Sequence, residues 1–386
     1  MKARHIPVGW RQIKHNRLRL IAALAGITFA ALLMMVQMGV RDAMFDSGIR
    51  WHKAWDYDIA ILSPKSEYLL ELHDIPRVRI FQAAGVSGVR AVTPVYTKLG
   101  KWRNPEKPKI VWPIFIAAFD PADEGFGQII TPQQQANLRL DDYYVFDRLS
   151  RPEYGPIPAM LETAETVALE MNSRRIRIGG LFEVGNSFGI NGALITSDLN
   201  FLRMFPDRKP SAVTLGLIQT EPGAGAEEVR DAIIATLPPD VSVLTREQFQ
   251  AMEVAYWNNS TPIGYVLNMG VIMGLIVGAI IVYQILFADV QDHLKEYATL
   301  KAMGYTNGYL SGVVLQEAAI LAIAGFIPAI ILSLVVFRIT AGATNLPLEL
   351  TPGKAGMVFG LTLLMCTFAG LLAMRKVRSA DPADVF

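Results

Sequence analysis

Long apolar runs alternate with charged segments along this chain, and four of the runs are long enough to cross a membrane. Spanning a bilayer core of about 30 Å takes roughly 20 consecutive apolar residues in a helix, because only a helix or a closed barrel satisfies its own backbone hydrogen bonds in lipid. Charged residues recur too often elsewhere for a further span. The pattern predicts transmembrane helices at 20–40, at 263–288, at 309–337 with an apolar core at Ala318–Phe337, and at 355–374.

The first span has two interpretations. Its stretch ALAGITFAA contains small residues of the kind that precede a signal-peptide cleavage site. However, an apolar core of 21 residues exceeds the roughly 7 to 15 residues of a signal-peptide core. An uncleaved anchor is therefore the favoured interpretation, and a cleaved signal peptide is the alternative.

Basic residues near the spans predict the orientation of the chain. Residues 1–19 carry six Lys or Arg residues, against three in the twenty residues after the first span, and the tail 375–386 adds three more. An excess of Lys and Arg marks the cytoplasmic side of a membrane. We therefore expect both termini and the segment 289–304 in the cytoplasm, and the region 41–262 and the loop 338–354 on the outer side.

The region between the first two spans is long enough to fold as a domain. It has about 220 residues, far more than a connecting loop. Several of its stretches are rich in β-branched and aromatic residues and are bounded by turn residues, which is typical of strands. A helix pattern with Val229, Ile233 and Ile234 on one face lies between two such stretches, as in a β-α-β unit. We expect an α+β domain at 41–262, with strands at 57–62, 110–119, 166–171, 175–184, 211–220 and 240–245 and a helix at 225–237.

Composition changes this picture little. The chain is 52% hydrophobic and its 36 basic residues nearly cancel its 35 acidic ones, so no overall charge points to nucleic acid. The single cysteine, Cys366, lies in the fourth span. We expect the outer domain to be held by its own core without disulfides, and Cys366 to be a small packing residue.

The sequence shows no catalytic or metal-binding motif. Its five histidines lack the H-E-x-x-H spacing, and no G-x-S-x-G elbow is present. The stretch TPGKAG at 351–356 lacks the first Gly and the Ser or Thr of a phosphate-binding P-loop. We expect no catalytic site and no metal in this chain. One polar candidate inside a span is Glu317, since ionisable residues in lipid usually have a function; a position near the membrane surface is the other interpretation.

Glycines at four-residue spacing indicate close helix packing. Gly270, Gly274 and Gly278 have this spacing in the second span, and Gly356 and Gly360 have it in the fourth. Because glycine has no side chain, another helix can approach closely at these positions. Contact within the chain and contact with a second copy both remain open.

A short charged segment follows the second span. Asp289–Met303 lacks Gly and Pro and consists of strong helix formers, and Gly304 is placed to end the helix. Asp292, Lys295 and Glu296 fall on its exposed side. A helix that is half apolar and half charged is suited to a groove of a soluble protein or to the surface of the lipid headgroups.

Three stretches match the pattern of a known protein family. They are EYATLKAMGYTNGYL at 296–310, WRQIKHNRLRLIAALAGI at 10–27 and RKVRSADPADVF at 375–386. They resemble the E-I-A-x-L-K-A-x-G segment, the basic interfacial opening helix and the basic tail of ABC-transporter permeases of the FtsX and MacB type. YATLKAMGY resembles the DevC branch in particular, although Tyr297 stands where many members have Ile. The order of one span, a large outer domain and three spans also matches.

This resemblance implies partners and a coupling site. Such permeases act as homodimers with two separate ATPase subunits, so ATP and Mg²⁺ are expected in a partner chain. The segment between the second and third spans meets the ATPase, which assigns coupling to Lys295, Glu296, Tyr297, Lys301 and Gly304. DevC-like systems further imply a periplasmic membrane-fusion adaptor and an outer-membrane channel.

The implied function is that of an efflux subunit in the bacterial inner membrane. ATP hydrolysis in the partner would move the periplasmic domain, a mechanotransmission that expels a lipid-like or amphiphilic substrate. One alternative is an FtsX-like relay that activates a cell-wall hydrolase without transport. Another is a membrane sensor or enzyme that has no ATPase.

Overall fold

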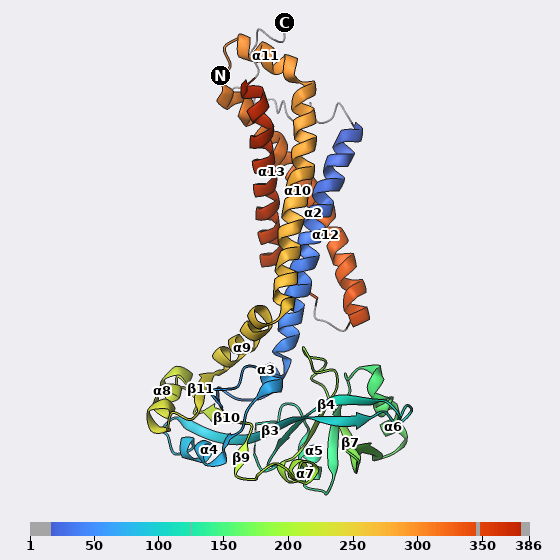
Figure 1. Cartoon of the computed structure of the whole chain (residues 1–386), viewed down its shortest axis with the longest axis vertical. Coiled ribbons are helices and arrows are strands. Elements are labelled where there is room, and N and C mark those ends of the chain that lie inside the picture. Colours follow the sequence, from blue (N-terminus) through green and yellow to red (C-terminus); the bar gives the residue numbers. More distant parts are fainter. Residues whose placement is uncertain (1–16, 124, 345–347, 380–386) are drawn as a thin grey trace. The chain divides into compact units, whose positions relative to one another are not determined.

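A computed structural model describes residues 17–123, 125–344 and 348–379 of the chain (Figure 1). The chain divides into two compact units. The helical unit comprises Met1–Ala43 and Pro262–Phe386. The second comprises Met44–Thr261 and is called the outer unit after its predicted side of the membrane. The interfacial helix predicted at 1–19 lies largely outside the described residues, and so does much of the predicted tail.

Four long helices form most of the helical unit. They are α2 (Arg17–Gly48), α10 (Pro262–Asp292), α12 (Asn307–Thr344) and α13 (Pro352–Ser379). Each contains a stretch long and apolar enough to cross a membrane: Leu20–Gly48, Pro262–Asp292, Gly308–Gly342 and Pro352–Met374. The chain is thus a multi-pass membrane protein, as predicted. Every helix runs farther than its predicted span, because hydropathy marks the part suited to lipid and the backbone can stay helical beyond it.

A mixed sheet of nine strands is the frame of the outer unit, in the order β11-β1-β10-β3-β4-β8-β5-β7-β6. Its strands are β1 (Ile59–Leu62), β3 (Val89–Arg103), β4 (Val111–Phe119), β5 (Tyr143–Asp147), β6 (Val167–Met171), β7 (Arg174–Phe182), β8 (Ala193–Ser197), β10 (Leu215–Thr220) and β11 (Ser242–Thr245). Two further short strands, β2 (Ile75–Pro76) and β9 (Ala212–Val213), pair with each other.

Part of this sheet closes on itself. Strand β6 pairs with β3 through Met171 and Trp102, so the strands from β3 through β4, β8, β5 and β7 to β6 form a ring. Side chains alternate across it, as they do along any strand. Ile114 of β4 packs with Trp102 in one core cluster, whereas Phe115 packs with Trp51 in another. The outer unit therefore has a core on each side of its sheet.

The predicted β-α-β unit is present in a split form. Helix α8 (Ala226–Thr236) joins β10 to β11, and β1 lies between these strands and is antiparallel to both. Val229 and Ile233 are buried as predicted, but Ile234 is 52% exposed. A helix turns by about 100° per residue, so the face that includes residues 229 and 233 turns residue 234 away.

The remaining helices of the outer unit are short. They are α3 (Arg50–Ala54), α4 (Arg77–Ala83), α5 (Pro132–Asn137), α6 (Ile157–Thr163), α7 (Asp198–Met204) and α9 (Arg246–Ala255), with single turns at Leu69–Glu71 and Pro152–Tyr154 and a π-helical turn at Tyr256–Ser260.

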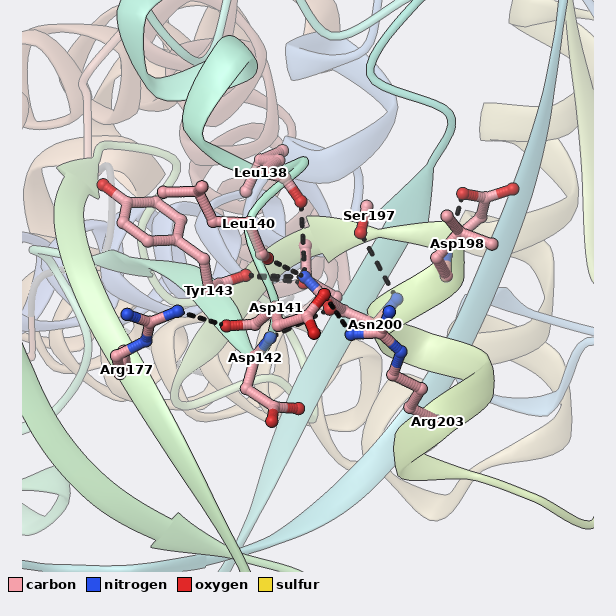
Figure 2. Close-up of polar contacts among 12 residues, drawn as sticks. Leu138, Leu140, Asp141, Asp142, Tyr143, Arg177, Ser197, Asp198, Asn200 and Arg203 are labelled. Carbon is pink, nitrogen blue, oxygen red and sulfur yellow. Dashed lines mark hydrogen bonds and ion pairs between the residues drawn. The ribbon is translucent and has the colours of Figure 1, made fainter.

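A buried asparagine fixes the turn that leads into β5 (Figure 2). Asn200 on α7 is 2% exposed, and its oxygen accepts a hydrogen bond from the N–H of Asp142 at 3.0 Å. Its amide nitrogen donates to the carbonyl oxygens of Leu138, Leu140 and Tyr143 at 3.3, 2.9 and 3.4 Å. The φ of Asp142 is 56°, a left-handed conformation that Asp tolerates. This cluster satisfies buried backbone groups, so its role is structural.

Candidate functional site: the elbow between α10 and α12

The candidate site is the elbow, residues 289–310, which joins α10 to α12 through the short helix α11 (Leu294–Ala302). The single helix predicted over Asp289–Met303 is wrong, because α10 ends at Asp292 and the chain bends at His293 (Figure 1). The His293 N–H donates to the carbonyl oxygen of Asp289 at 3.1 Å, and its ring Nδ1 lies 2.9 Å from the same oxygen. A side chain that contacts the carbonyl four residues earlier competes with the regular helix bonds and favours a bend.

Gly304 ends α11, as predicted. Its φ is +93°, a left-handed conformation that suits glycine because there is no Cβ to clash. The Gly304 N–H donates to the carbonyl of Lys301 at 3.0 Å, and the Tyr305 N–H donates to the carbonyl of Leu300 at 3.1 Å. These two bonds form a Schellman motif, which satisfies carbonyls at the helix end. The bonds of His293 thus close the last turn of α10, and those of Gly304 and Tyr305 close the end of α11.

One face of α11 packs against the helical bundle. Ala298 is 6% exposed, and Leu294 and Leu300 contact a core cluster that includes Val290 of α10 and Leu310 of α12. A displacement of α11 that left the neighbouring helices in place would lose these apolar contacts, which favours movement together.

The opposite face of the elbow combines charges with exposed apolar side chains. Lys295 and Glu296 are exposed, as predicted. Met303, Tyr305 and Tyr309, which we call the tip, are 63%, 44% and 44% exposed, and the two tyrosine rings are 4.8 Å apart. Large apolar side chains exposed among charges are typical of protein-binding surfaces.

The sequence analysis missed the tip as a functional feature. The available signal was the position of Tyr305 directly after the helix-ending Gly304, where a turn leaves a side chain uncovered. Among the residues assigned to coupling, Lys301 is half-buried and Gly304 has the structural role given above. The side chain of Tyr297 lies outside the described residues.

Glu317 of α12 is a buried residue that contacts the elbow at Asp289. It is 3% exposed, and its carboxyl group contacts that of Asp289 on α10. The Glu317 Oε2 atom is buried without a hydrogen-bond partner among the described residues. The Asp289 Oδ2 atom in turn lies 3.6 Å from Nδ1 of His293. Glu317 therefore connects α12 to the bend of the elbow, a contact that the sequence did not reveal.

The glycines of α10 contact helices of the same chain. A Cβ atom on Gly278 would collide with Met365 Sδ of α13 and lie 2.6 Å from Ala30 Cβ of α2. A Cβ on Gly274 would lie 3.1 Å from Leu33 Cδ2, and one on Gly270 would lie 2.5 Å from Gln37 Cδ. The structure thus places the whole predicted stripe of α10 in contacts within the helical unit.

The two glycines of α13 behave differently. No described atom would lie within 4 Å of a Cβ added to Gly356 or Gly360. These two residues do not mediate helix packing within the described part of the chain, and their contact with a second copy stays a prediction.

No group of three or more His, Cys, Asp or Glu residues that could hold a metal ion occurs in the described parts of the chain. Cys366 is buried and forms no disulfide.

Comparison with known proteins places the elbow inside a family match. Residues 268–382 match the family described as FtsX-like permease C-terminal, which includes most of α10, the elbow, α12 and α13. This match covers less than half of the chain. No curated protein matches the chain.

Two solved structures are similar to part of the chain. One is the extracellular domain of the noncanonic ABC-type transporter YknZ from Gram-positive bacteria, with 12% identity, a TM-score of 0.35, and 49% of this chain and 100% of that chain covered. The other is the periplasmic region of MacB from Actinobacillus actinomycetemcomitans, with 10% identity, a TM-score of 0.34, and 50% of this chain and 91% of that chain covered. Both TM-scores are low, so these likenesses by themselves establish neither the fold nor the function of this chain.

Proposed function

We propose that this chain is the permease subunit of an ABC exporter and that a separate ATPase is mechanically coupled to it through the elbow. One observation carries the proposal: the elbow exposes the charged face of α11 and the tip that follows it, while the other face of α11 packs in the bundle, within the part that matches an FtsX-like permease. Such a helix can bind a soluble partner on one side and move membrane helices on the other.

The proposed mechanism begins in the ATPase, where ATP and Mg²⁺ bind. Closure of the ATPase dimer carries the tip with it. Because α11 is closed at Gly304 and its apolar side packs against α10 and α12, its displacement moves these two helices. Helix α10 is continuous over 31 residues. A displacement at Asp292 is therefore passed along its length to Pro262, which directly follows Thr261, the last residue of the outer unit. A local event thereby biases a larger assembly with two states.

The finer features of this exporter belong to the proposal as well. The chain acts as a homodimer in the bacterial inner membrane, with both termini and the elbow in the cytoplasm. Its outer unit lies in the periplasm, where it works with a membrane-fusion adaptor and an outer-membrane channel. The substrate is a lipid-like or amphiphilic molecule. An FtsX-like relay would use the same elbow but have a cell-wall hydrolase as its outer partner.

The test is capture of the ATPase by the tagged, full-length chain from its native membrane, followed by mass spectrometry and an assay of ATP hydrolysis. The coupling variant replaces Lys295, Glu296 and Lys301 by Ala. Its matched control replaces the exposed Glu106, Lys107 and Lys109 of the outer unit by Ala, which removes the same types of charge.

We expect the coupling variant to capture at least about tenfold less ATPase, since its charged contacts are lost. The control should capture as much as the wild type, and both variants should insert into the membrane. Equal capture by the wild type and the coupling variant would place the ATPase contact elsewhere. Recovery of an adaptor points to export, whereas recovery of a hydrolase in its place points to the relay.

A further inference from the structure

The outer unit has a basic hollow on the surface of β3, which we call the β3 hollow. Its volume is about 380 Å³, within the range of small-molecule sites of roughly 300 to 1,000 Å³. The lining includes Lys98, Leu99, Lys101 and Arg103 of β3 and Val111 at the start of β4. These belong to two adjacent strands, since Arg103 is paired with Val111 in the sheet.

A hairpin turn forms one wall of the hollow. The two turn residues between β6 and β7, Asn172 and Ser173, have φ values of 49° and 60°, as a two-residue hairpin turn requires. The turn is hydrogen-bonded to the backbone N–H and the backbone carbonyl of Lys101 in β3. The Lys101 N–H donates to Asn172 Oδ1 at 2.8 Å, and the Asn172 N–H donates to the Lys101 carbonyl at 3.0 Å. The wall is therefore fixed to the strand that carries the cations.

The hollow is positively charged. Three cations line it, and none of the described residues that line it is a carboxylate. Arg103 forms an exposed ion pair with Glu170 at 3.2 Å. Lys98 forms an ion pair with Asp207 at 2.9 Å, and the Asp207 side chain is 67% exposed. Lys101 is exposed and has no ion pair among the described residues. Exposed ion pairs contribute little in water, so Lys98 can exchange its partner at small cost.

Apolar surface lies directly beside these charges. Leu99 and Val111 are 41% and 45% exposed. Phe205, another lining residue, is 6% exposed, and its ring centroid lies 4.7 Å from Nζ of Lys98. A ligand in the hollow would therefore meet both cations and aliphatic carbon, since Leu99, Lys101 and Arg103 share one face of β3 and Val111 is paired with Arg103.

We propose that the β3 hollow binds the anionic headgroup of an amphiphile, whose acyl chain lies along Leu99 and Val111. The occupant follows from charge complementarity, since Lys101 and the exposed ion-pair cations Lys98 and Arg103 can bind a phosphate or carboxylate group, and from the aliphatic surface beside them. This inference adds the charge of the headgroup to the proposed function. Only the role of the bound molecule as transported substrate rests on that proposed function.

The test uses the full-length chain without any ATPase, in nanodiscs of phosphatidylcholine, titrated with dodecyl phosphate. Dodecylphosphocholine, which is zwitterionic, and inorganic phosphate, which has no acyl chain, are the comparison ligands. The site variant is K98Q/K101Q, and the matched control is K107Q/K109Q, whose lysines are exposed on the following loop and do not line the hollow. Partition of the amphiphile into the nanodisc is the same for all variants, so differences between variants report the hollow.

We expect K98Q/K101Q to bind dodecyl phosphate about tenfold more weakly than the wild type, and K107Q/K109Q to remain within about twofold. Lys101, Lys107 and Lys109 are exposed and Lys98 is half-buried with only an exposed ion pair, and both variants keep Arg103, so the melting temperature should change by no more than about 2 °C. Equal loss in the two variants, or equally tight binding of dodecylphosphocholine, would overturn the proposal.

A second variant, L99Q, tests the apolar side. It should weaken dodecyl phosphate about fivefold and leave inorganic phosphate unchanged, because only the amphiphile has a chain to bury. Unchanged dodecyl phosphate binding in L99Q would show a site for free anions and overturn the amphiphile assignment. Because no ATPase is present, failure here is distinct from failure of ATPase capture.

Discussion

The two units of this chain are packed with different side chains. The largest fully buried side chains all belong to the outer unit: Trp51, Trp55, Trp102, Tyr57, Tyr96, Tyr144, Tyr154, Phe115, Phe119, Phe126 and Phe146. The helices instead pack mainly through small and aliphatic residues, among them Ala23, Ala30, Ala31, Gly274, Gly278, Ala318, Ala322, Ala329, Ala369 and Ala373. Water drives the burial of large rings, whereas lipid is as apolar as a side chain, so membrane helices associate through close approach. The outer unit is therefore stabilised mainly by burial of large aromatic rings, and the helical unit mainly by close approach of helices at small residues.

The largest effect should come from adding volume where two helices approach closely. Gly278→Leu places a side chain against Met365 and Ala30. We expect it to lower the free energy of unfolding by about 3 kcal/mol or more, so that little folded protein survives extraction into detergent. Size-exclusion chromatography of the extracted protein measures this loss.

The control for this change is Gly360→Leu on α13, where no described atom would lie within 4 Å of the new Cβ. Its extraction yield should equal that of the wild type in a detergent that keeps the chain monomeric. If both variants were extracted equally well, close approach at Gly278 would not matter for packing.

Removing a large ring from the outer unit should have a similar but more local effect. Trp102 is fully buried, closes the ring of strands opposite Met171, and donates its indole N–H to the carbonyl of Tyr154 at 3.0 Å. Trp102→Ala should cost about 3 to 5 kcal/mol, because a cavity and an unmade hydrogen bond are left behind. Thermal unfolding of the full-length chain measures the cost.

Leu199→Ala serves as the comparison, since Leu199 is 63% exposed. It should shift the melting temperature by no more than about 2 °C. Similar losses in the two variants would show that the aromatic core does not dominate the stability of the outer unit.

The smallest expected effect is on the pH dependence of the stability of the outer unit. Burial, with a further contribution from the neighbouring Asp120, raises the pKa of the half-buried Asp123 from 3.8 to about 6. The folded state then holds a proton that the unfolded state has released between pH 4 and pH 6, so stability falls as the pH rises through this range. Solvent screening keeps the effect below about 1 kcal/mol.

Asp123→Asn should flatten this part of the pH profile, measured as the change in melting temperature between pH 4.5 and pH 7. Glu165→Gln, at an exposed position of the same unit, should leave the profile as it is in the wild type. An unchanged profile in Asp123→Asn would assign the pH dependence to another group.

The sequence predicted the helical unit well because a lipid span has a strict length requirement, which an apolar run such as 20–40 displays directly. Strand β3 was missed because Pro94 and Gly100 interrupt it and Lys98 and Lys101 break its alternation. Neither local propensity nor periodicity marks a strand that passes from a core to a basic surface. Its basic residues can be recognised as a candidate binding surface only when β4 and the β6–β7 turn are known to lie beside it.

The candidate site shows the same division. Gly304 could be assigned from the sequence because a helix end needs a left-handed residue, which is a local requirement. The bend at His293 depends on one side chain that contacts the backbone, and the Glu317 contact joins residues of different helices. Such contacts depend on how the helices pack, which a pattern along one helix does not contain.

The most direct test of the central claim is photocrosslinking from the tip in native membranes. A photoreactive amino acid replaces Tyr305 in one variant and Leu199, an exposed residue of the outer unit, in another. The account predicts that position 305 crosslinks to a P-loop ATPase, more strongly when ATP is bound, and that position 199 does not. If the ATPase crosslinked from position 199, or from neither position in a chain that still captures it, the elbow would not be the coupling site.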